Sequence, residues 1–145
     1  MKVKQLSVFV ENQPGRLAAV AKSLGQAGIN MMAMTIAETR EFGVVRMIVA
    51  DWEKGMKILK DAGFTVTTTE VLAIEVLDQP GALAKVLESF VQRGLNIEYM
   101  YAFVAKRGNA AILVFRFDDT DKAAAALKGT EVKVLTNEEV VSLEN

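Results

Sequence analysis

Apolar and polar residues alternate near the start of the chain, and the spacing of the apolar residues then lengthens. Leu6, Val8 and Val10 alternate with Ser7, Phe9 and Glu11, which predicts a β-strand. Beyond the dipeptide Pro14-Gly15, the apolar residues follow the spacing of one helix face: Leu17, Val20, Ala21, Leu24 and Ala27. Gly28 stands where a glycine commonly ends a helix. The pattern therefore predicts a strand, a tight turn and a helix.

The same pattern returns further along the chain. Residues 4–34 align without a gap with residues 70–100 at a constant offset of 66, and 13 of the 31 aligned positions are identical. The identical pairs include Gln13/Gln79, Pro14/Pro80, Gly15/Gly81 and Asn30/Asn96. Self-similarity at a fixed period indicates one structural unit used twice, and this period suits a small domain.

The remaining elements follow from the same reasoning. Residues 29–39 and 44–50 are expected to be strands joined by a turn at residues 40–43. Asp51 is expected to cap a short helix ending near Gly63, and residues 64–69 to be extended. In the second copy, the corresponding elements are expected at residues 71–77, 82–93, 95–105, 110–117, 122–128 and 132–135.

The order strand, helix, strand, strand, helix, strand predicts an α+β fold of two tandem ferredoxin-like βαββαβ modules. Each would have an antiparallel sheet with both helices on one face. We place the modules at residues 1–69 and 70–136, followed by a short tail, 137–145. Thr136 and Glu139 form a capping-box pattern, which predicts a short helix at the end of the chain.

Two of the predicted strands are apolar on both faces. Residues 30–36 and 110–117 carry apolar side chains at both alternating sets of positions. Such strands are usually buried on both faces, yet the module supplies helices for one face only. A second copy of the sheet or a partner chain is the expected cover. Contact with a membrane is the alternative, and the scattered charges argue against it.

Composition narrows the classes of function. The chain has 145 residues, 51% of them hydrophobic, with 17 basic and 18 acidic residues, so no basic field favours nucleic-acid binding. It has neither cysteine nor histidine, which removes thiolate chemistry and the commonest general base and metal ligand. Neither a secretory segment nor a membrane-spanning run is evident. We expect a cytoplasmic protein that is not an enzyme and carries neither metal nor cofactor.

The repeated Pro-Gly loop is the candidate site. Backbone N–H groups of Gly15, Arg16 and Leu17 are expected to be free at the positive end of a helix dipole, where a carboxylate would bind. The side-chain oxygen of Asn12, or of Asp78 in the second copy, would accept hydrogen bonds from an ammonium group. Asn30 and Asn96 begin the next strand. The arrangement fits an α-amino acid, but Asn and Asp are also strong helix caps, and spacing alone leaves both readings open.

These loops resemble those of the ACT domain, a small βαββαβ regulatory module of many enzymes of amino-acid metabolism. The resemblance rests on Asn12-x-Pro14-Gly15-x-Leu17 with Gly28-Ile29-Asn30, and on Asp78-x-Pro80-Gly81-x-Leu83 with Gly94-Leu95-Asn96. It covers residues 3–135 as two tandem modules. It implies that modules pair and that free amino acids bind at the interfaces between them. The implied ligand-binding residues are Asn12, Gln13, Pro14, Gly15, Arg16, Leu17, Asn30, Asp78, Gln79, Pro80, Gly81, Ala82, Leu83 and Asn96.

The resemblance has two departures. The chain has no catalytic domain, so either a regulated enzyme of amino-acid metabolism would be a separate chain, or the protein is a sensor or carrier by itself. Arg16 is matched by Ala82, so the two sites need not share a ligand. We therefore expect a homodimeric regulatory protein that signals amino-acid binding to an enzyme in trans. The alternative is a scaffold that uses the fold only for assembly.

Two further patterns have simpler explanations. Asp118, Asp119 and Asp121 lack the glycine and additional ligands of a cation-binding loop, so helix capping is the better account. Tyr99, Tyr101 and Phe103 alternate like the aromatic platform of an RNA-binding sheet, but the flanking sequence does not match. A core or interface stripe is the better interpretation.

Overall fold

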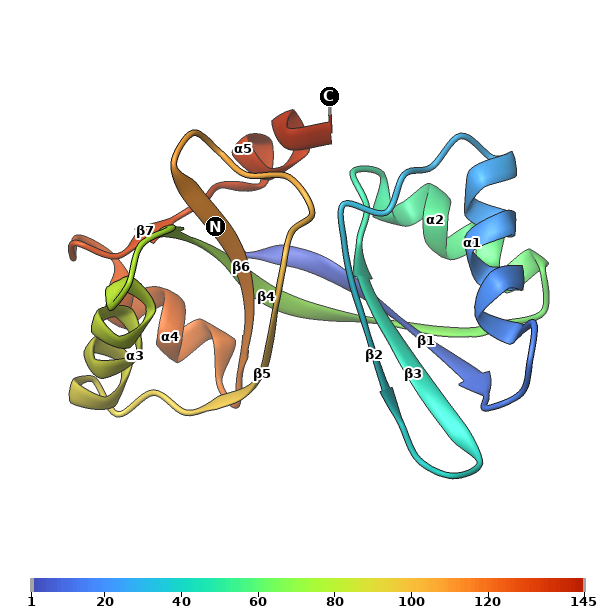
Figure 1. Ribbon diagram of the computed structural model, residues 1–145, viewed down its shortest axis with the longest axis horizontal. Helices are drawn as coiled ribbons and strands as arrows, with labels where there is room; N and C mark the ends of the chain where they lie inside the picture. Colours follow the sequence, from blue (N-terminus) through green and yellow to red (C-terminus); the bar gives the residue numbers. More distant parts are fainter. Residues whose placement is uncertain (1, 145) are drawn as a thin grey trace. The chain divides into compact units, whose positions relative to one another are not determined.

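The computed structural model describes residues 2–144, which form two compact units (Figure 1). The N-terminal unit is Lys4–Thr69. The C-terminal unit is Glu70–Leu143 together with the first residues of the chain. Each unit is an antiparallel sheet with two helices, and the expected α+β fold of two ferredoxin-like modules is confirmed.

The N-terminal unit has the predicted order of elements. These are β1 (Val3–Glu11), α1 (Arg16–Gln26), β2 (Ala33–Glu38), β3 (Phe42–Ile48), α2 (Trp52–Asp61) and the first residues of β4 (Thr65–Leu77). Strand β3 lies between β1 and β2, and Leu6 pairs with Met47 and Val8 with Val45. These side chains are buried against Val20 and Leu24 of α1 and Leu59 of α2.

The C-terminal unit repeats this arrangement. It comprises the rest of β4, α3 (Ala82–Gln92), β5 (Ile97–Ala102), β6 (Ala110–Phe117), α4 (Thr120–Leu127) and the two-residue strand β7 (Lys133–Val134). Phe90 of α3 lies edge-on to Phe115 and Phe117 of β6, with ring centroids 5.2 Å and 5.1 Å away. This geometry is favourable for aromatic pairs, and all three rings are fully buried.

Several element boundaries differ from the prediction, among them the turn before β3 and the ends of β4. The turn between β2 and β3 is shorter than residues 40–43, since Phe42 and Gly43 already belong to β3. Gly43 lies in the strand opposite Val10, where an added Cβ would stand 3.5 Å from that side chain. The strands predicted at residues 64–69 and 71–77 are a single strand, β4, because this stretch contains no glycine or proline to interrupt it.

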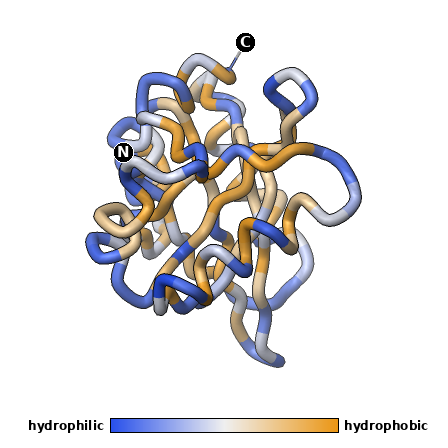
Figure 2. The backbone as a smooth tube through the Cα atoms, turned by 90° about the vertical axis from the view of Figure 1, so that its left-hand side faces the viewer, coloured by the Kyte–Doolittle hydropathy of each residue, from blue (hydrophilic) through white to orange (hydrophobic). Residues whose placement is uncertain are grey.

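The predicted burial of both strand faces holds for β6 but not for β2. In β6, neighbouring residues Ile112, Leu113, Val114 and Phe115 point to alternating faces, and all four are buried. In β2, Met34 and Ile36 are 42% and 49% exposed. The expectation that both faces of this strand are buried is therefore wrong for the single chain. In Figure 2 the loops that project from the backbone trace are largely hydrophilic, and hydrophobic stretches run between them.

The aromatic stripe and the acidic cluster have the structural roles that were expected. Tyr101 and Phe103 are buried, so they offer no exposed platform for bases. Asp119 caps α4 by accepting a hydrogen bond from the N–H of Lys122 at 3.0 Å. Asp121 forms an ion pair with Lys2 at 2.6 Å.

The C-terminal helix α5 (Asn137–Val141) begins with the predicted capping box between Thr136 and Glu139. The Glu139 carboxylate also accepts a hydrogen bond from Arg107 at 2.6 Å. The bond from the Thr136 N–H, followed by that from Arg107, lowers the pKa of Glu139 from 4.5 to about 2. A 3₁₀ turn, Ser142–Glu144, follows α5. No helix among residues 2–144 is long and apolar enough to cross a membrane.

Candidate functional site

Both Pro-Gly loops start a helix in the same unusual way. Gly15 and Gly81 are the residues immediately before α1 and α3, with φ angles of 86° and 84°. This left-handed conformation is costly for residues that carry a Cβ, which explains why glycine occupies both positions. Neither helix start receives a side-chain capping bond. The first turns of α1 and α3 are therefore uncapped by any side chain of their own loops.

The capping interpretation of Asn12 and Asp78 is consequently wrong, because each side chain bonds elsewhere. Nδ2 of Asn12 donates to Oε2 of Glu38 and to the carbonyl oxygen of Thr39, both at 3.1 Å. The N–H of Asn12 donates to the carbonyl oxygen of Glu41 at 2.9 Å. Asn12 thus ties the Pro-Gly loop of the N-terminal unit to the turn between β2 and β3.

Asp78 makes the corresponding connection in the C-terminal unit. Its carboxylate forms an ion pair with Lys106, and its N–H donates to the carbonyl oxygen of Asn109 at 2.9 Å. Both partners belong to the connection between β5 and β6. The Asp78 and Lys106 side chains are 56% and 58% exposed, so a ligand ammonium could compete with Lys106 for this carboxylate.

The expected set of free backbone donors is only partly present. The N–H of Arg16 donates to the carbonyl oxygen of Gln13 at 3.3 Å, and that of Ala82 to Gln79 at 3.2 Å, because the turn closes on itself. The expectation of a free Arg16 N–H is therefore wrong. The N–H groups of Leu17 and Leu83 face no hydrogen-bond acceptor among residues 2–144.

Asn30 and Asn96 are exposed and lie before the next strand rather than within it. The strands were expected to begin at residues 29 and 95, but β2 begins at Ala33 and β5 at Ile97. Within the described part of the chain, neither asparagine side chain bonds to its Pro-Gly loop. The carbonyl oxygen of Asn96 accepts a hydrogen bond from the N–H of Asp118 at 3.2 Å.

A hollow of about 700 Å³ adjoins the Pro-Gly loop of the C-terminal unit. Four of the predicted site residues line it: Gln79, Pro80, Gly81 and Ala82. Asp78, Leu83 and Asn96 do not. The remaining lining residues come from β4, α3 and the segment around β7: Glu75, Val76, Leu77, Lys85, Val86, Ser89, Glu131, Val132 and Lys133.

Sequence reasoning missed the charged residues of this hollow. Lys85 replaces Ala19 of the first copy, and Glu75 replaces Phe9, so these positions are not part of the identical repeat. The sequence signal that could have identified them is that these positions carry a charged residue in the second copy of the repeat and an uncharged one in the first. That difference was noted for Arg16 and Ala82 but not for Lys85.

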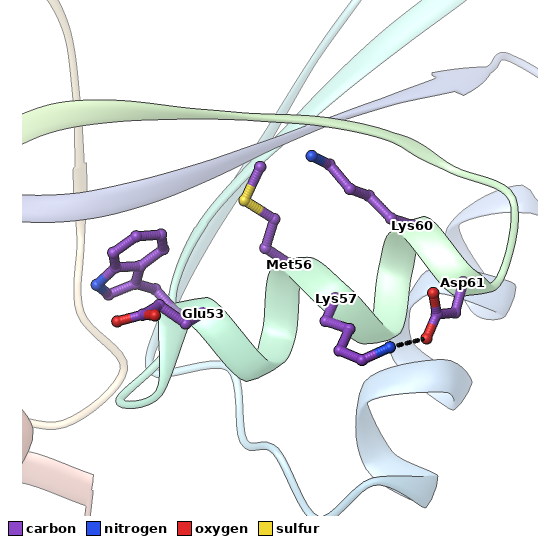
Figure 3. Close-up of a pocket in the computed structure, with 6 residues that line it drawn as sticks. Glu53, Met56, Lys57, Lys60 and Asp61 are labelled. Carbon is purple, nitrogen blue, oxygen red and sulfur yellow. Dashed lines mark hydrogen bonds and ion pairs between the residues drawn. The ribbon is translucent and has the colours of Figure 1, made fainter.

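A second hollow, of about 350 Å³, lies over α2 in the N-terminal unit (Figure 3). Met56 and Lys60 project to one side of the helix, while Lys57 bonds to Asp61 at 2.7 Å. The Lys4 ammonium stands 5.7 Å from the centre of the Trp52 ring, which also lines the hollow. No predicted site residue lies here, so we assign this hollow no role.

Comparison with known proteins places the chain in a family. The family model described as ACT domain pair matches residues 1–144. A crystal structure of a protein from Bacteroides thetaiotaomicron is 43% identical, with a TM-score of 0.91, and the alignment covers 99% of this chain and 98% of that one. No curated protein matches the chain.

More distant structures share the fold. The ligand-free regulatory subunit of aspartate kinase from Thermus thermophilus has a TM-score of 0.61 at 18% identity, covering 86% of this chain and 87% of that one. The regulatory subunit from Thermus flavus has a TM-score of 0.57 at 18% identity, covering 86% and 89%.

Proposed function

This chain belongs to the family of ACT domain pairs, and from that premise we propose that it is a non-catalytic regulatory protein that binds a free amino acid. The ligand would bind at interfaces between paired modules, and binding would be signalled to an enzyme of amino-acid metabolism in trans. The protein would be cytoplasmic and homodimeric.

The observation that carries this proposal is the uncapped start of α1 and α3. Asn12 and Asp78 do not cap these helices, and the N–H groups of Leu17 and Leu83 have no acceptor among the described residues. A helix N-terminus with free N–H groups attracts a carboxylate. Beside each is a side chain with an oxygen suited to an ammonium. Both ends of an amino acid therefore have candidate partners.

The proposed ligand contacts are the two Pro-Gly loops and the asparagine that follows each helix. They comprise Asn12, Gln13, Pro14, Gly15, Arg16, Leu17 and Asn30, and Asp78, Gln79, Pro80, Gly81, Ala82, Leu83 and Asn96. Asn30 and Asn96 are exposed and stand before edge strands, where a paired module would reach them.

The rival function is a scaffold that binds no small molecule. The ion pair between Asp78 and Lys106 is the observation that favours it, because it supplies that carboxylate with a partner from within the chain. An enzyme is the weaker alternative, since the sequence has no histidine or cysteine to serve as base or nucleophile.

Thermal unfolding in the presence of each of the twenty amino acids tests the proposal. A ligand at 100 times its Kd stabilises the folded protein by about 2.7 kcal/mol. For a chain of this size we expect the Tm to rise by roughly 5–10 °C with one amino acid or a chemically related few. An unchanged Tm with all twenty, with the fold intact, would favour the scaffold.

A further inference from the structure

The two modules differ at the place where the C-terminal hollow lies, and the difference begins at one aligned pair of residues. Ala82 lines the hollow, as does Glu131, which follows Gly129 and Thr130 at the end of α4. In the N-terminal module Arg16 is aligned with Ala82 and Thr65 with Glu131, and Phe64 lies between Gly63 and Thr65 after α2. Gly63 and Gly129 both have positive φ angles, 93° and 76°, so the two turns correspond.

Arg16 fills the place that Ala82 leaves open. Its guanidinium carbon stands 5.0 Å from the centre of the Phe64 ring, within the range of a cation–π contact. Its Nε is buried and has no hydrogen-bond partner. The side chain thus crosses from the start of α1 to the turn after α2. In the C-terminal module the aligned residue is Ala82. Its side chain is only a methyl group and cannot span the same distance.

Of the four charged residues that line the hollow of the C-terminal module, three have an oppositely charged partner. Glu75 has Arg107 at 3.9 Å, Glu131 has Arg93 at 4.0 Å, and Lys133 has Glu139 at 3.8 Å. The Lys85 ammonium has no ion-pair or hydrogen-bond partner among residues 2–144. The hollow therefore offers one unmatched positive charge, which suits a ligand carboxylate.

Apart from its charged residues, Gln79 and Ser89, the lining of the hollow is apolar. Val76, Ala82, Val86 and Val132 lie along it, and its volume of about 700 Å³ exceeds that of a single amino acid. Small-molecule sites commonly combine such an apolar lining with a few placed polar groups.

We infer that each chain holds one amino acid, in the hollow of the C-terminal module, and that this amino acid has an apolar side chain. Its carboxylate pairs with Lys85 beside the uncapped start of α3, and its side chain packs on Val76, Val86 and Val132. Arg16 closes the equivalent place in the N-terminal module. The inference rests on the proposed function and narrows it to one module and one class of ligand.

Calorimetric titration of the full chain with leucine tests this assignment, with asparagine as a polar ligand of similar size. We expect leucine to bind at one molecule per chain and more tightly than asparagine. Ala82→Arg should abolish leucine binding by filling the hollow. Val91→Arg, the matched control at an apolar residue of α3 that is 76% exposed and does not line the hollow, should leave the affinity and the stoichiometry unchanged.

Lys85→Gln is a second test variant. Lys85 is exposed, so this substitution tests the site even if Ala82→Arg disturbs the fold. It should weaken leucine binding by roughly ten- to a hundredfold, through the loss of one charge-assisted bond. The decarboxylated analogue 3-methylbutylamine should not bind the wild type.

The remaining outcomes separate this inference from the proposed function. Binding of an amino acid that persists in Ala82→Arg and in Lys85→Gln would overturn the inference and leave the proposed function standing, with the ligand elsewhere. Preference for asparagine over leucine, or binding of two molecules per chain, would also overturn it. Failure of the wild type to bind any of the twenty amino acids would overturn both.

Discussion

At the scale of single residues, Asp78 differs from the aspartates that cap helices. Asp51 and Asp119 accept a hydrogen bond from the N–H three residues later, at 3.1 Å and 3.0 Å. Asp78 makes no such bond, and its carboxylate pairs with the exposed ammonium of Lys106. Exposed ion pairs contribute little to stability because water and salt screen them, whereas a capping bond satisfies a backbone donor.

We therefore expect Asp78→Ala to lower the free energy of unfolding by less than about 1 kcal/mol. High salt should remove most of this effect, since screening acts on the ion pair. The matched control Asp119→Ala should cost about 1 kcal/mol or more through loss of its cap, at low and high salt alike. Urea unfolding at two salt concentrations measures both variants. An Asp78→Ala cost that resists salt would restore the capping interpretation.

The residue types predicted the position of the two Pro-Gly loops, but they did not predict the bonding partners of Asn12 and Asp78. The Pro-Gly pairs mark the turn because glycine tolerates the left-handed conformation seen at Gly15 and Gly81. The bonds of Asn12 and Asp78 run to segments roughly 30 residues away in sequence, at Thr39 and Lys106. Local propensity carries no information about such partners, so Asn and Asp were read as possible caps of the adjacent helix. The contribution of Glu131 to the lining of the hollow is non-local in the same way.

At the scale of elements, periodicity predicted the helices and strands, while their ends depended on contacts between them. The turn near Phe42 was misplaced because Gly43 was read as a turn residue, although it lies in β3 opposite Val10. The first residues after α1 look like a strand by composition, yet β2 starts only at Ala33, where pairing with Ile48 begins. Strand pairing, rather than propensity, determined these ends.

Helix α5 provides a prediction for acid pH. Glu139 has a pKa of about 2 in the folded chain, against 4.5 for the ordinary group, because Thr136 and Arg107 donate hydrogen bonds to its carboxylate. Between these two pH values the unfolded chain binds more protons at this residue than the folded chain does. This contribution to stability is therefore complete above about pH 4.5 and is lost as the pH falls toward 2.

Glu139→Gln should consequently flatten the dependence of stability on pH between about pH 2 and 4.5, because glutamine does not titrate in this range. Thermal unfolding followed by circular dichroism at half-unit pH intervals provides the measurement. Glu138→Gln on the same helix is the control and should retain the wild-type slope, because in the described part of the chain Arg107 bonds to Glu139 and not to Glu138. Equal slopes for all three proteins would show that Glu139 titrates alike in the folded and unfolded chains.

At the scale of the whole molecule, the exposed apolar residues of the N-terminal unit motivate the expected homodimer. Phe9 and Phe42 are 45% and 57% exposed. Phe9 lies next to Val8 and Val10, whose side chains point to the helices, so its own side chain points to the opposite face. Phe42 pairs with Glu11, two residues further along β1 on that same face. Large exposed aromatic residues on a sheet face are typical of a surface that another chain covers.

We expect Phe42→Glu to shift the chain from dimer to monomer at micromolar concentration, because a carboxylate would be buried without a partner in the interface. Val91→Glu, at an apolar residue that is 76% exposed on α3, is the control and should leave the dimer intact. Sedimentation equilibrium distinguishes the two states directly.

If the ligand binds between paired modules, the amino acid that raises the Tm should also lower the dimer dissociation constant, by mass action. A wild-type chain that sediments as a monomer with and without that amino acid would contradict the homodimer and the proposed route of signalling together.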